Sequence, residues 1–478
     1  MPKNDPQPDR RLLQLCLAGI AAITLWRIAL LPFSTAELFV DEAQYWFWGQ
    51  ELDWGYYSKP PLIGWLLRLS TTIGTDSPFW IHVPLAIIHA GTALLVMATG
   101  RQLLGARVGS LAGLAFATLP GVALASLLVS TDTPMLFFFA LALLAFVKLG
   151  KKPSTAWAVA MGAAIGLGLM SKYAMIYFPV SAALCAFLLP SARISWRDAG
   201  IAAVVALIVI SPNIWWNLSN DLTTLQHTAD NADYRGLQLE FGKLLEFWGG
   251  QFAVSGPVLF AAFLVALRTA SRRPETAFLA LMALPTLVIV SVQAVLSGAN
   301  ANWAAAGHIA AVLLGMSLLV RFPAWLKASF AVNGVLCIAL PVLVIFADSL
   351  RIGSGNLLMD RYIGMRAVSE RAATIAEREG LDTLVSENRA ILADFFYTLK
   401  GSDLALYSEP PEGFPKHHYA QSHPLPREGG EVLYISKKAK PPARCAEAEP
   451  IETWEATEGF FVGTLGAFRL PRSCWFDE

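Results

Sequence analysis

Long apolar runs recur through the first three quarters of this chain. A helix needs about 20 apolar residues to cross the ~30 Å hydrocarbon core of a bilayer. Soluble folds do not contain so many apolar runs of that length. Of the 478 residues, 55% are hydrophobic and only 15% are charged. The formal net charge is zero, so no basic excess points to nucleic acid. The sequence therefore predicts a polytopic α-helical membrane protein that binds no nucleic acid.

Eleven of the runs are long enough to be membrane spans. We place them at 12–32, 80–99, 108–127, 134–149, 156–171, 173–190, 199–216, 247–267, 276–296, 303–320 and 328–347. From Leu350 onward the runs stop, and the composition becomes that of a soluble α/β domain. We therefore expect a membrane domain over residues 1–347 and a C-terminal α/β domain over residues 348–478.

Basic residues predict the orientation of the spans. They cluster near the N-terminus and in alternate connections: Lys3, Arg10 and Arg11; Arg101 and Arg107; Lys148, Lys151 and Lys152; Arg193 and Arg197; Arg268, Arg272 and Arg273; Arg321 and Lys327. Cytoplasmic loops carry an excess of Lys and Arg, so all of these segments should share the cytoplasmic side. We expect the N-terminus to be cytoplasmic and the C-terminal domain to lie on the outer side of the membrane. The first span is typical of a signal anchor, with a cleavable signal peptide as the alternative.

The apolar stretch from Ala156 to Pro190 is either one overlong helix or two short spans. Basic clusters flank it at both ends, and both must lie in the cytoplasm. The chain must therefore return to the side from which it started. This predicts a hairpin that turns at Ser171-Lys172-Tyr173.

Ionisable and amide side chains gather on the opposite, outer face. They comprise Asp41, Glu42, Lys59, Asp132, Lys172, the polar loop 219–243, Asn300 and Asn302. Charges at a membrane boundary are costly to hold and are usually functional. These outer residues have no topological reason for their positions, so we expect one outer reaction site.

The acid pair Asp41-Glu42 follows the first span within an aromatic stretch. Adjacent residues on a helix point about 100° apart, so the two carboxylates cannot face the same atom. One can act as a base while the other pairs with a cation or a metal ion. The alternative is an interfacial acid pair that merely ends the span.

Two lysines are candidates for binding an anionic group. Lys59 precedes Pro60-Pro61, and this pair forces a rigid, extended exit that fixes the ammonium group. A lysine that snorkels to the surface is the alternative for this position. Lys172 lies at the predicted hairpin tip, where it could equally seek the membrane interface.

The remaining polar candidates have stronger structural alternatives. Asp132 precedes Pro134 and could be a helix N-cap, a site acid or both. A solvated loop is favoured over a ligand set for 217–243, which carries His227, Asp230, Asp233 and Arg235. His308 lies more than a turn inside a late span and is expected to be a packing histidine.

The five cysteines match no metal-ligand spacing. Cys16, Cys185 and Cys337 lie in apolar spans, where a cysteine behaves as a small hydrophobic residue. Cys445 and Cys474 both lie in the C-terminal domain, which the predicted topology puts in an oxidising compartment. We therefore expect these two to form a disulfide, with two free thiols as the alternative.

Six motifs in this order resemble those of a known family. They are Asp41-Glu42, Lys59-Pro60-Pro61, Asp132-Thr133-Pro134-Met135, Gly168 to Tyr173, Asn302-Trp303 and the C-terminal segment Ser386 to Tyr397. Together they resemble the ArnT-like and protein O-mannosyltransferase-like branch of the GT-C membrane glycosyltransferases. The resemblance covers nearly the whole chain.

The resemblance implies a GT-C fold and a hexosyl- or pentosyltransferase. Such an enzyme moves a sugar, with inversion, from a polyprenyl-phosphate donor to a periplasmic acceptor such as lipid A, a saccharide or a protein. It also implies membrane lipids as partners, a location in a bacterial inner membrane and a periplasmic C-terminal domain. The competing hypothesis is a transporter or flippase for the same lipid-linked sugar. The sequence shows no inverted repeat, which favours the enzyme.

The resemblance also implies roles for named residues. Asp41, Glu42 and Asp132 would be catalytic. The substrate-binding set would be Tyr57, Lys59, Lys172, Tyr173 and Asn302, with Lys59 on the donor phosphate. A divalent metal ion is the one cofactor considered, with Asp41, Asp132 and His227 as candidate ligands.

Overall fold

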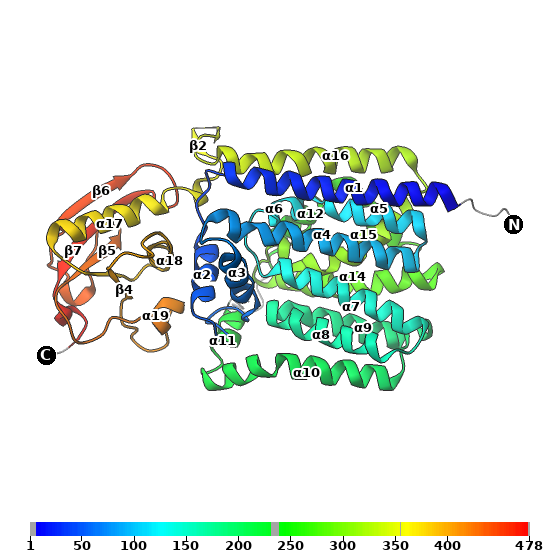
Figure 1. The fold of residues 1–478 in the computed structure, drawn as a ribbon, viewed down its shortest axis with the longest axis horizontal. Helices are drawn as coiled ribbons and strands as arrows, with labels where there is room; N and C mark the ends of the chain where they lie inside the picture. Colours follow the sequence, from blue (N-terminus) through cyan, green and yellow to red (C-terminus); the bar gives the residue numbers. More distant parts are fainter. Residues whose placement is uncertain (1–5, 231–238, 354, 477–478) are drawn as a thin grey trace.

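The chain folds into a long helical bundle with an α/β domain at one end (Figure 1). The computed structural model describes residues 6–230, 239–353 and 355–476. Helix α1 begins at the end of the bundle farthest from the C-terminal domain (Figure 1). The short helices α2 (Val40–Gln50), α3 (Leu62–Ile73) and α11 (Thr223–Asp230) lie between the bundle and the domain.

The bundle consists of apolar helices that cover every predicted span. They are α1 (Pro6–Leu30), α4 (Pro78–Leu103), α5 (Ala106–Ala117), α6 (Pro120–Ala125), α7 (Asp132–Lys151), α8 (Thr155–Ser171), α9 (Tyr177–Leu188), α10 (Trp196–Ser219), α12 (Phe241–Ser255), α13 (Pro257–Leu267), α14 (Pro274–Ser297), α15 (Ala305–Leu319) and α16 (Pro323–Leu343). Within the described residues, seven helices are long and apolar enough to cross a membrane, or eight if the bent pair α12–α13 counts as one span. The spans predicted around α5, α8 and α9 fall on shorter helices, so eleven crossings stay a prediction.

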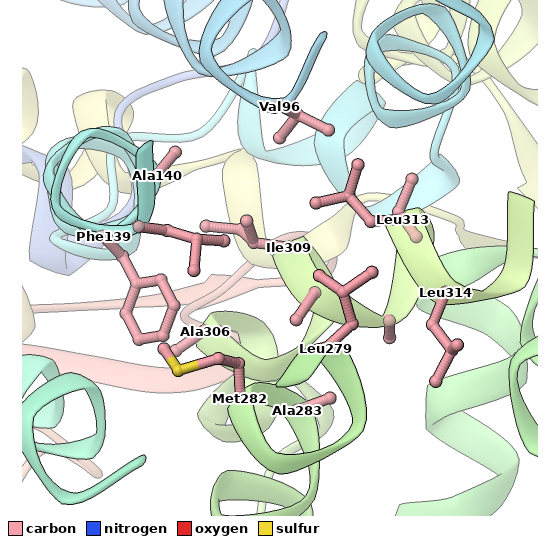
Figure 2. Close-up of a cluster of buried hydrophobic side chains, with 14 of the residues drawn as sticks. Val96, Phe139, Ala140, Leu279, Met282, Ala283, Ala306, Ile309, Leu313 and Leu314 are labelled. Carbon is pink, nitrogen blue, oxygen red and sulfur yellow. The ribbon is translucent and has the colours of Figure 1, made fainter. Parts of the chain in front are cut away.

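Helix α15 forms the centre of the bundle. It is apolar all round, and such a helix is stable only when its whole surface is covered. Figure 2 shows its side chains Ile309 and Leu313 packed among residues of α4, α7 and α14. Phe139 of α7 and Met282 of α14 are fully buried beside it. This core fixes the helix ends on which the site is built.

The predicted hairpin in 156–190 is confirmed. Helix α8 ends at Ser171, Lys172 is extended, and the chain resumes through a short 3-10 turn into α9. The chain has returned to the side from which α8 starts by the beginning of α10, where Oδ2 of Asp198 accepts from the Ser154 amide N–H at 3.3 Å. Lys172 therefore lies at the tip of the hairpin.

The span predicted at 247–267 falls on two helices, α12 and α13. The chain bends by 112° between α12 and α13. The bend occurs at Gly256, whose φ of +82° is a conformation that other residues rarely adopt. A Cβ at this position would lie 1.8 Å from Oδ1 of Asn333. Pro257 then starts α13, where its missing N–H costs nothing.

A buried polar cluster stabilises this bend. The imidazole of His308 bonds to Ser255 Oγ at 2.6 Å through Nδ1 and to Gln251 Oε1 at 2.7 Å through Nε2. The amide group of Asn333 donates to the Ser255 carbonyl at 3.1 Å. Buried polar groups are costly unless they are paired, and these side chains satisfy one another. His308 is thus the packing histidine that the sequence predicts.

The C-terminal domain contains a five-stranded mixed sheet of order β4-β3-β5-β7-β6. Its strands are β3 (Thr383–Ser386), β4 (Ala405–Ser408), β5 (Val432–Lys437), β6 (Glu452–Ala456) and β7 (Gly463–Leu470), and β1 (Arg351–Ile352) pairs with β2 (Asn356–Leu357) outside it. Strand β3 is parallel to β4 and β5, and β7 is antiparallel to β5 and β6. The domain helices are α17 (Met365–Glu379), α18 (Arg389–Thr398) and α19 (His418–Ser422). The predicted disulfide Cys445–Cys474 is present, with its Cα atoms 5.5 Å apart.

The C-terminal domain shares a hydrophobic core with helix α2. The rings of Phe47 and Phe396 lie 4.5 Å apart, and those of Trp46 and Tyr397 lie 5.1 Å apart. The Tyr397 hydroxyl also donates to the Asp76 carbonyl at 2.9 Å. Aromatic pairs of this kind bury a large area in a fixed geometry. The start of α18 is thereby held over the start of α2.

Candidate active site

A cavity of about 800 Å³ lies between the bundle and the C-terminal domain. Its wall is formed by α2, the loop before α3, the start of α7, the α8–α9 hairpin, α11, α14, the start of α15 and two segments of the C-terminal domain. The charged and histidine side chains of this wall are Asp41, Lys59, Asp132, Lys172, His227, Arg389, Lys416 and His417. A cavity of this size suits a sugar and its phosphate.

The cavity brings together all but one of the site residues predicted from the sequence. Those present in its wall are Asp41, Tyr57, Lys59, Asp132, Lys172, Tyr173, His227 and Asn302. Glu42 is the one that does not line it. The roles of the gathered residues stay predictions. Asp233 and Arg235 lie outside the described residues.

Asp132 is an acid of the cavity wall whose carboxylate accepts three hydrogen bonds from side chains. It is the first residue of α7, and its carboxylate does not cap that helix. Oδ1 accepts a hydrogen bond from Lys172 Nζ at 2.7 Å, and Oδ2 accepts from the Asn302 amide at 2.9 Å and from the Ser130 hydroxyl at 3.2 Å. Only 8% of the Asp132 side chain and 19% of the Lys172 side chain are exposed. This arrangement locks three chain segments together and leaves Asp132 little capacity for further partners.

Lys59 presents an unpaired cation to the cavity. Its backbone carbonyl accepts from the Tyr56 amide at 3.1 Å, which fixes the loop. Within the described residues its Nζ makes no hydrogen bond or ion pair. Burial, followed by the nearby Lys172 charge, lowers the pKa of the Lys59 ammonium to about 8. An anion bound here would gain a partner that has already lost much of its water.

Asp41 faces the cavity and pairs with Arg389 of the C-terminal domain. The guanidinium bonds to Asp41 Oδ1 through one NH2 group and to Gln44 Oε1 through Nε, the latter at 2.8 Å. Asn388 caps α18 by accepting from the Ala390 amide at 2.9 Å, which orients the start of that helix. The Asp41 and Arg389 side chains are 44% and 38% exposed. Asp41 is thus an accessible carboxylate in the wall.

Glu42 points away from Asp41, as the helical geometry predicts. Its Oε2 accepts from the Phe39 amide at 2.8 Å at the start of α2. Its Oε1 accepts from the Val129 amide at 2.6 Å and lies 3.1 Å from His82 Nε2. The carboxylate is buried and fully occupied. Glu42 therefore links the start of α2 to the segment before α7.

Aromatic and imidazole groups complete the wall near Lys59. The Tyr57 hydroxyl donates to the Pro415 carbonyl at 3.0 Å, and its ring lies 5.2 Å from that of His227. Burial, together with the charge of Lys59, lowers the pKa of His227 to about 4, so this ring is neutral near pH 7. Tyr173 donates to Asn213 Oδ1 at 2.8 Å and holds the hairpin tip against α10.

Sequence reasoning missed the three charged or histidine wall residues that come from the C-terminal domain. Arg389 follows a clear N-cap, Asn388, but no local pattern shows that it reaches Asp41 across 348 residues of sequence. Lys416 and His417 belong to an irregular segment before α19. Burial lowers the pKa of His417, which leaves this ring neutral near pH 7. Lys416 is exposed and adds a second cation to the domain side of the wall.

The candidate metal ligands do not form a metal site. Asp41 is engaged by Arg389, and Asp132 is engaged by Lys172 and Asn302. In the part of the chain that the structure describes, no group of three or more His, Cys, Asp or Glu residues is placed to hold a metal ion. A metal requirement therefore stays a prediction.

Known proteins resemble this chain in sequence, one of them over nearly its full length. The lipid A galacturonosyltransferase RgtD of Rhizobium johnstonii is 38% identical over 464 residues, which are 95% of this chain and 98% of that protein. The lipopolysaccharide core galacturonosyltransferase RgtA of the same organism is 30% identical over 52% of this chain and 51% of that protein. Residues 58–216 match the family described as dolichyl-phosphate-mannose-protein mannosyltransferase.

Solved structures share the fold at low sequence identity. ArnT from Cupriavidus metallidurans bound to undecaprenyl phosphate superposes with a TM-score of 0.68 at 15% identity, over 94% of this chain and 97% of that one. The oligosaccharyltransferase of Archaeoglobus fulgidus gives a TM-score of 0.52 at 12% identity, over 88% and 69%. At these identities the likeness is one of fold.

The relationship to RgtD, at 38% identity over 95% of this chain, defines an integral membrane glycosyltransferase. Within that class, the chain belongs to the GT-C membrane glycosyltransferases. The choice that the sequence left open between an enzyme and a flippase is thereby resolved in favour of the enzyme.

Proposed function

We propose that this protein transfers galacturonic acid from a polyprenyl-phosphate donor to lipid A. The observation that carries the proposal is the 38% identity to a lipid A galacturonosyltransferase, which extends through both domains. Because the cavity is built from both domains, an alignment of that extent includes its whole wall. The undecaprenyl phosphate bound to ArnT in the same fold supports a lipid-phosphate donor.

Lys59 is the proposed contact for the donor phosphate. Its ammonium faces the cavity from a rigid loop and has no partner in the described residues. Negative charge accumulates on the phosphate as the bond to the sugar breaks, and a fixed cation stabilises that charge. Lys172 adds to the positive field but is held by Asp132.

Asp41 is the proposed general base. The oxygen of a lipid A hydroxyl attacks the anomeric carbon of the sugar while its proton passes to the Asp41 carboxylate. The bond between the anomeric carbon and the phosphate oxygen breaks, and its electron pair leaves with the polyprenyl phosphate. Attack opposite the leaving group inverts the anomeric carbon. Of the two carboxylates in the wall, Asp41 is the accessible one, since Asp132 is saturated by hydrogen bonds.

We also propose that the protein lies in a bacterial inner membrane with its C-terminal domain in the periplasm. Three of the basic connections meet at one end of the bundle, where Lys151 Nζ donates to the Gln102 carbonyl at 2.8 Å and Arg197 donates to Thr155 at 2.9 Å. The positive-inside rule favours the cytoplasm for that end. The cavity would then open on the outer leaflet, where the lipid A acceptor is found.

Reconstitution tests the proposed function. The purified protein in lipid nanodiscs is incubated with polyprenyl-phosphate galacturonic acid and lipid A, and lipid A is analysed by mass spectrometry. We expect lipid A to gain the mass of one galacturonosyl residue, and no gain in the Asp41→Asn variant. Transfer of a neutral sugar with no transfer of galacturonic acid would contradict the proposed donor.

A further inference from the structure

The cavity wall contains more cationic than anionic side chains. Four cations, from Lys59, Lys172, Arg389 and Lys416, face two carboxylates, from Asp41 and Asp132. Its two histidines, His227 and His417, are neutral near pH 7 because burial lowers the pKa of each. The described wall therefore carries two positive charges in excess. A lipid-linked uronic acid carries two negative charges, one on its phosphodiester and one on its carboxylate.

The two ion pairs of the wall differ in how easily they exchange partners. The Lys172–Asp132 pair is mostly buried and is braced by Asn302, so opening it would strand a buried charge. The Arg389–Asp41 pair is about 40% exposed on both sides, and exposed ion pairs contribute little to stability because solvent screens them. Arg389 can therefore leave Asp41 for a bound anion at little cost. Its planar guanidinium matches a carboxylate with two parallel hydrogen bonds, which an ammonium cannot do.

We propose that Arg389 binds the carboxylate of the donor sugar. Through this contact the C-terminal domain selects donors whose sugar carries a negative charge. This inference rests on the proposed function. Lys59 takes the phosphate on the membrane side of the cavity, and Arg389 takes the sugar carboxylate on the domain side. Lys416, on the same side as Arg389, adds to the attraction through its charge.

The exchange of partners also acts on the base. While Arg389 is paired with Asp41, Oδ1 of the carboxylate is held in a hydrogen bond. When Arg389 turns to the donor carboxylate, Oδ1 of Asp41 is released for the incoming hydroxyl. A donor without a carboxylate leaves the pair in place. The same contact thus selects the donor and releases the base.

Two donors that differ only at C6 of the sugar test this proposal. Polyprenyl-phosphate galacturonic acid carries a carboxylate at C6, and polyprenyl-phosphate galactose carries a hydroxymethyl group there. Donor affinity and kcat/KM are measured for both in the wild type, Arg389→Gln, Arg389→Lys and Lys59→Gln. Affinity is read by competition with labelled undecaprenyl phosphate, so it reports on each donor even where turnover is slow. Thermal unfolding of each variant checks that the domain stays docked.

We expect Arg389→Gln to weaken binding of the uronosyl donor about 10- to 100-fold, as for loss of a charge-assisted contact, and to change galactosyl-donor affinity less than about threefold. Arg389→Lys should recover only part of the lost affinity, because an ammonium restores the charge but cannot donate two parallel hydrogen bonds to the carboxylate. Lys59→Gln should weaken both donors alike, since both carry the phosphate. An equal loss for both donors in Arg389→Gln would overturn the proposal and reduce Arg389 to a residue that positions Asp41. Absence of galacturonic acid transfer by the wild type would instead contradict the proposed function.

Discussion

The ammonium of Lys172 lies 2.7 Å from Oδ1 of Asp132, and this contact joins the tip of the α8–α9 hairpin to the first residue of α7. Asn302, just before α15, bonds to the other oxygen of the same carboxylate. Three helix ends that are remote in sequence are thereby fixed beside the cavity. The Lys172–Asp132 pair therefore acts as a structural clamp: it lines the site and also holds these helix ends together.

Removing one partner of this clamp should therefore destabilise the protein strongly. Lys172→Met leaves a buried carboxylate without its cation, which costs about 3–5 kcal/mol. The double variant Lys172→Met/Asp132→Asn removes both charges and should recover most of the lost thermal stability. Unfolding in detergent micelles, followed by circular dichroism, measures both. If Lys172→Met alone unfolds at the wild-type temperature, the pair is no clamp.

Donor binding should depend on pH through Lys59. The pKa of this ammonium lies at about 8, and a bound phosphate raises it. The attraction is therefore fully present below pH 8 and is lost as the pH rises above it. Affinity for undecaprenyl phosphate should fall about tenfold between pH 7 and pH 9.

Lys59→Arg provides the matched control, because a guanidinium keeps its proton throughout this range. Isothermal titration at each pH gives the affinities of both proteins. The arginine variant should show little change between pH 7 and pH 9. The same fall in both proteins would mean that another group is responsible.

Local sequence rules predicted a large part of this fold. Apolar runs located the helices of the bundle, and basic clusters at both ends of 156–190 required the hairpin. The positions of Asp41, Lys59, Asp132 and Lys172 in one wall followed from their common side of the membrane. These features follow from the thickness of the bilayer and from the side on which each connection lies, and both can be inferred from apolar runs and basic clusters in the sequence.

Features that depend on tertiary contacts were not predictable in this way. Gly256-Pro257 is a local signal for a break in the helix, but the contact of the bend with Asn333, which is remote in sequence, is not visible locally. Arg389 reaches Asp41 only because α18 shares a core with α2. The capping contact of Glu42 with the Phe39 amide follows a local pattern, whereas its contact with the Val129 amide does not; the catalytic role of Glu42 stays a prediction.

The bend at Gly256 should tolerate no side chain. Gly256→Ala combines a positive φ with a Cβ 1.8 Å from Asn333 Oδ1, so we expect a loss of stability well beyond ~1 kcal/mol. Gly249→Ala in the same helix is the matched control, because its Cβ meets nothing within 4 Å. That variant should be neutral or stabilised by up to about 1 kcal/mol. Equal thermal stability in the two variants would contradict the account of the bend.

The disulfide Cys445–Cys474 tests both the domain fold and the proposed periplasmic location. The two cysteines are separated by 29 positions, and such a loop closure stabilises the native state by about 3–4 kcal/mol in the chain-entropy model. Replacing both with serine should lower the unfolding temperature of the domain. Thiol labelling of protein denatured without reductant should leave this pair unmodified. Full labelling of both cysteines would argue for a reducing compartment.

The most direct measurement is single-turnover transfer by Asp41→Asn with saturating donor and lipid A. Loss of a general base lowers the rate about 10²- to 10⁴-fold, whereas donor affinity and thermal stability should stay close to those of the wild type. Asp230→Asn, an exposed acid at the end of α11, is the matched control and should transfer at the wild-type rate. A transfer rate in Asp41→Asn within threefold of the wild type would contradict the assignment of Asp41 as the base.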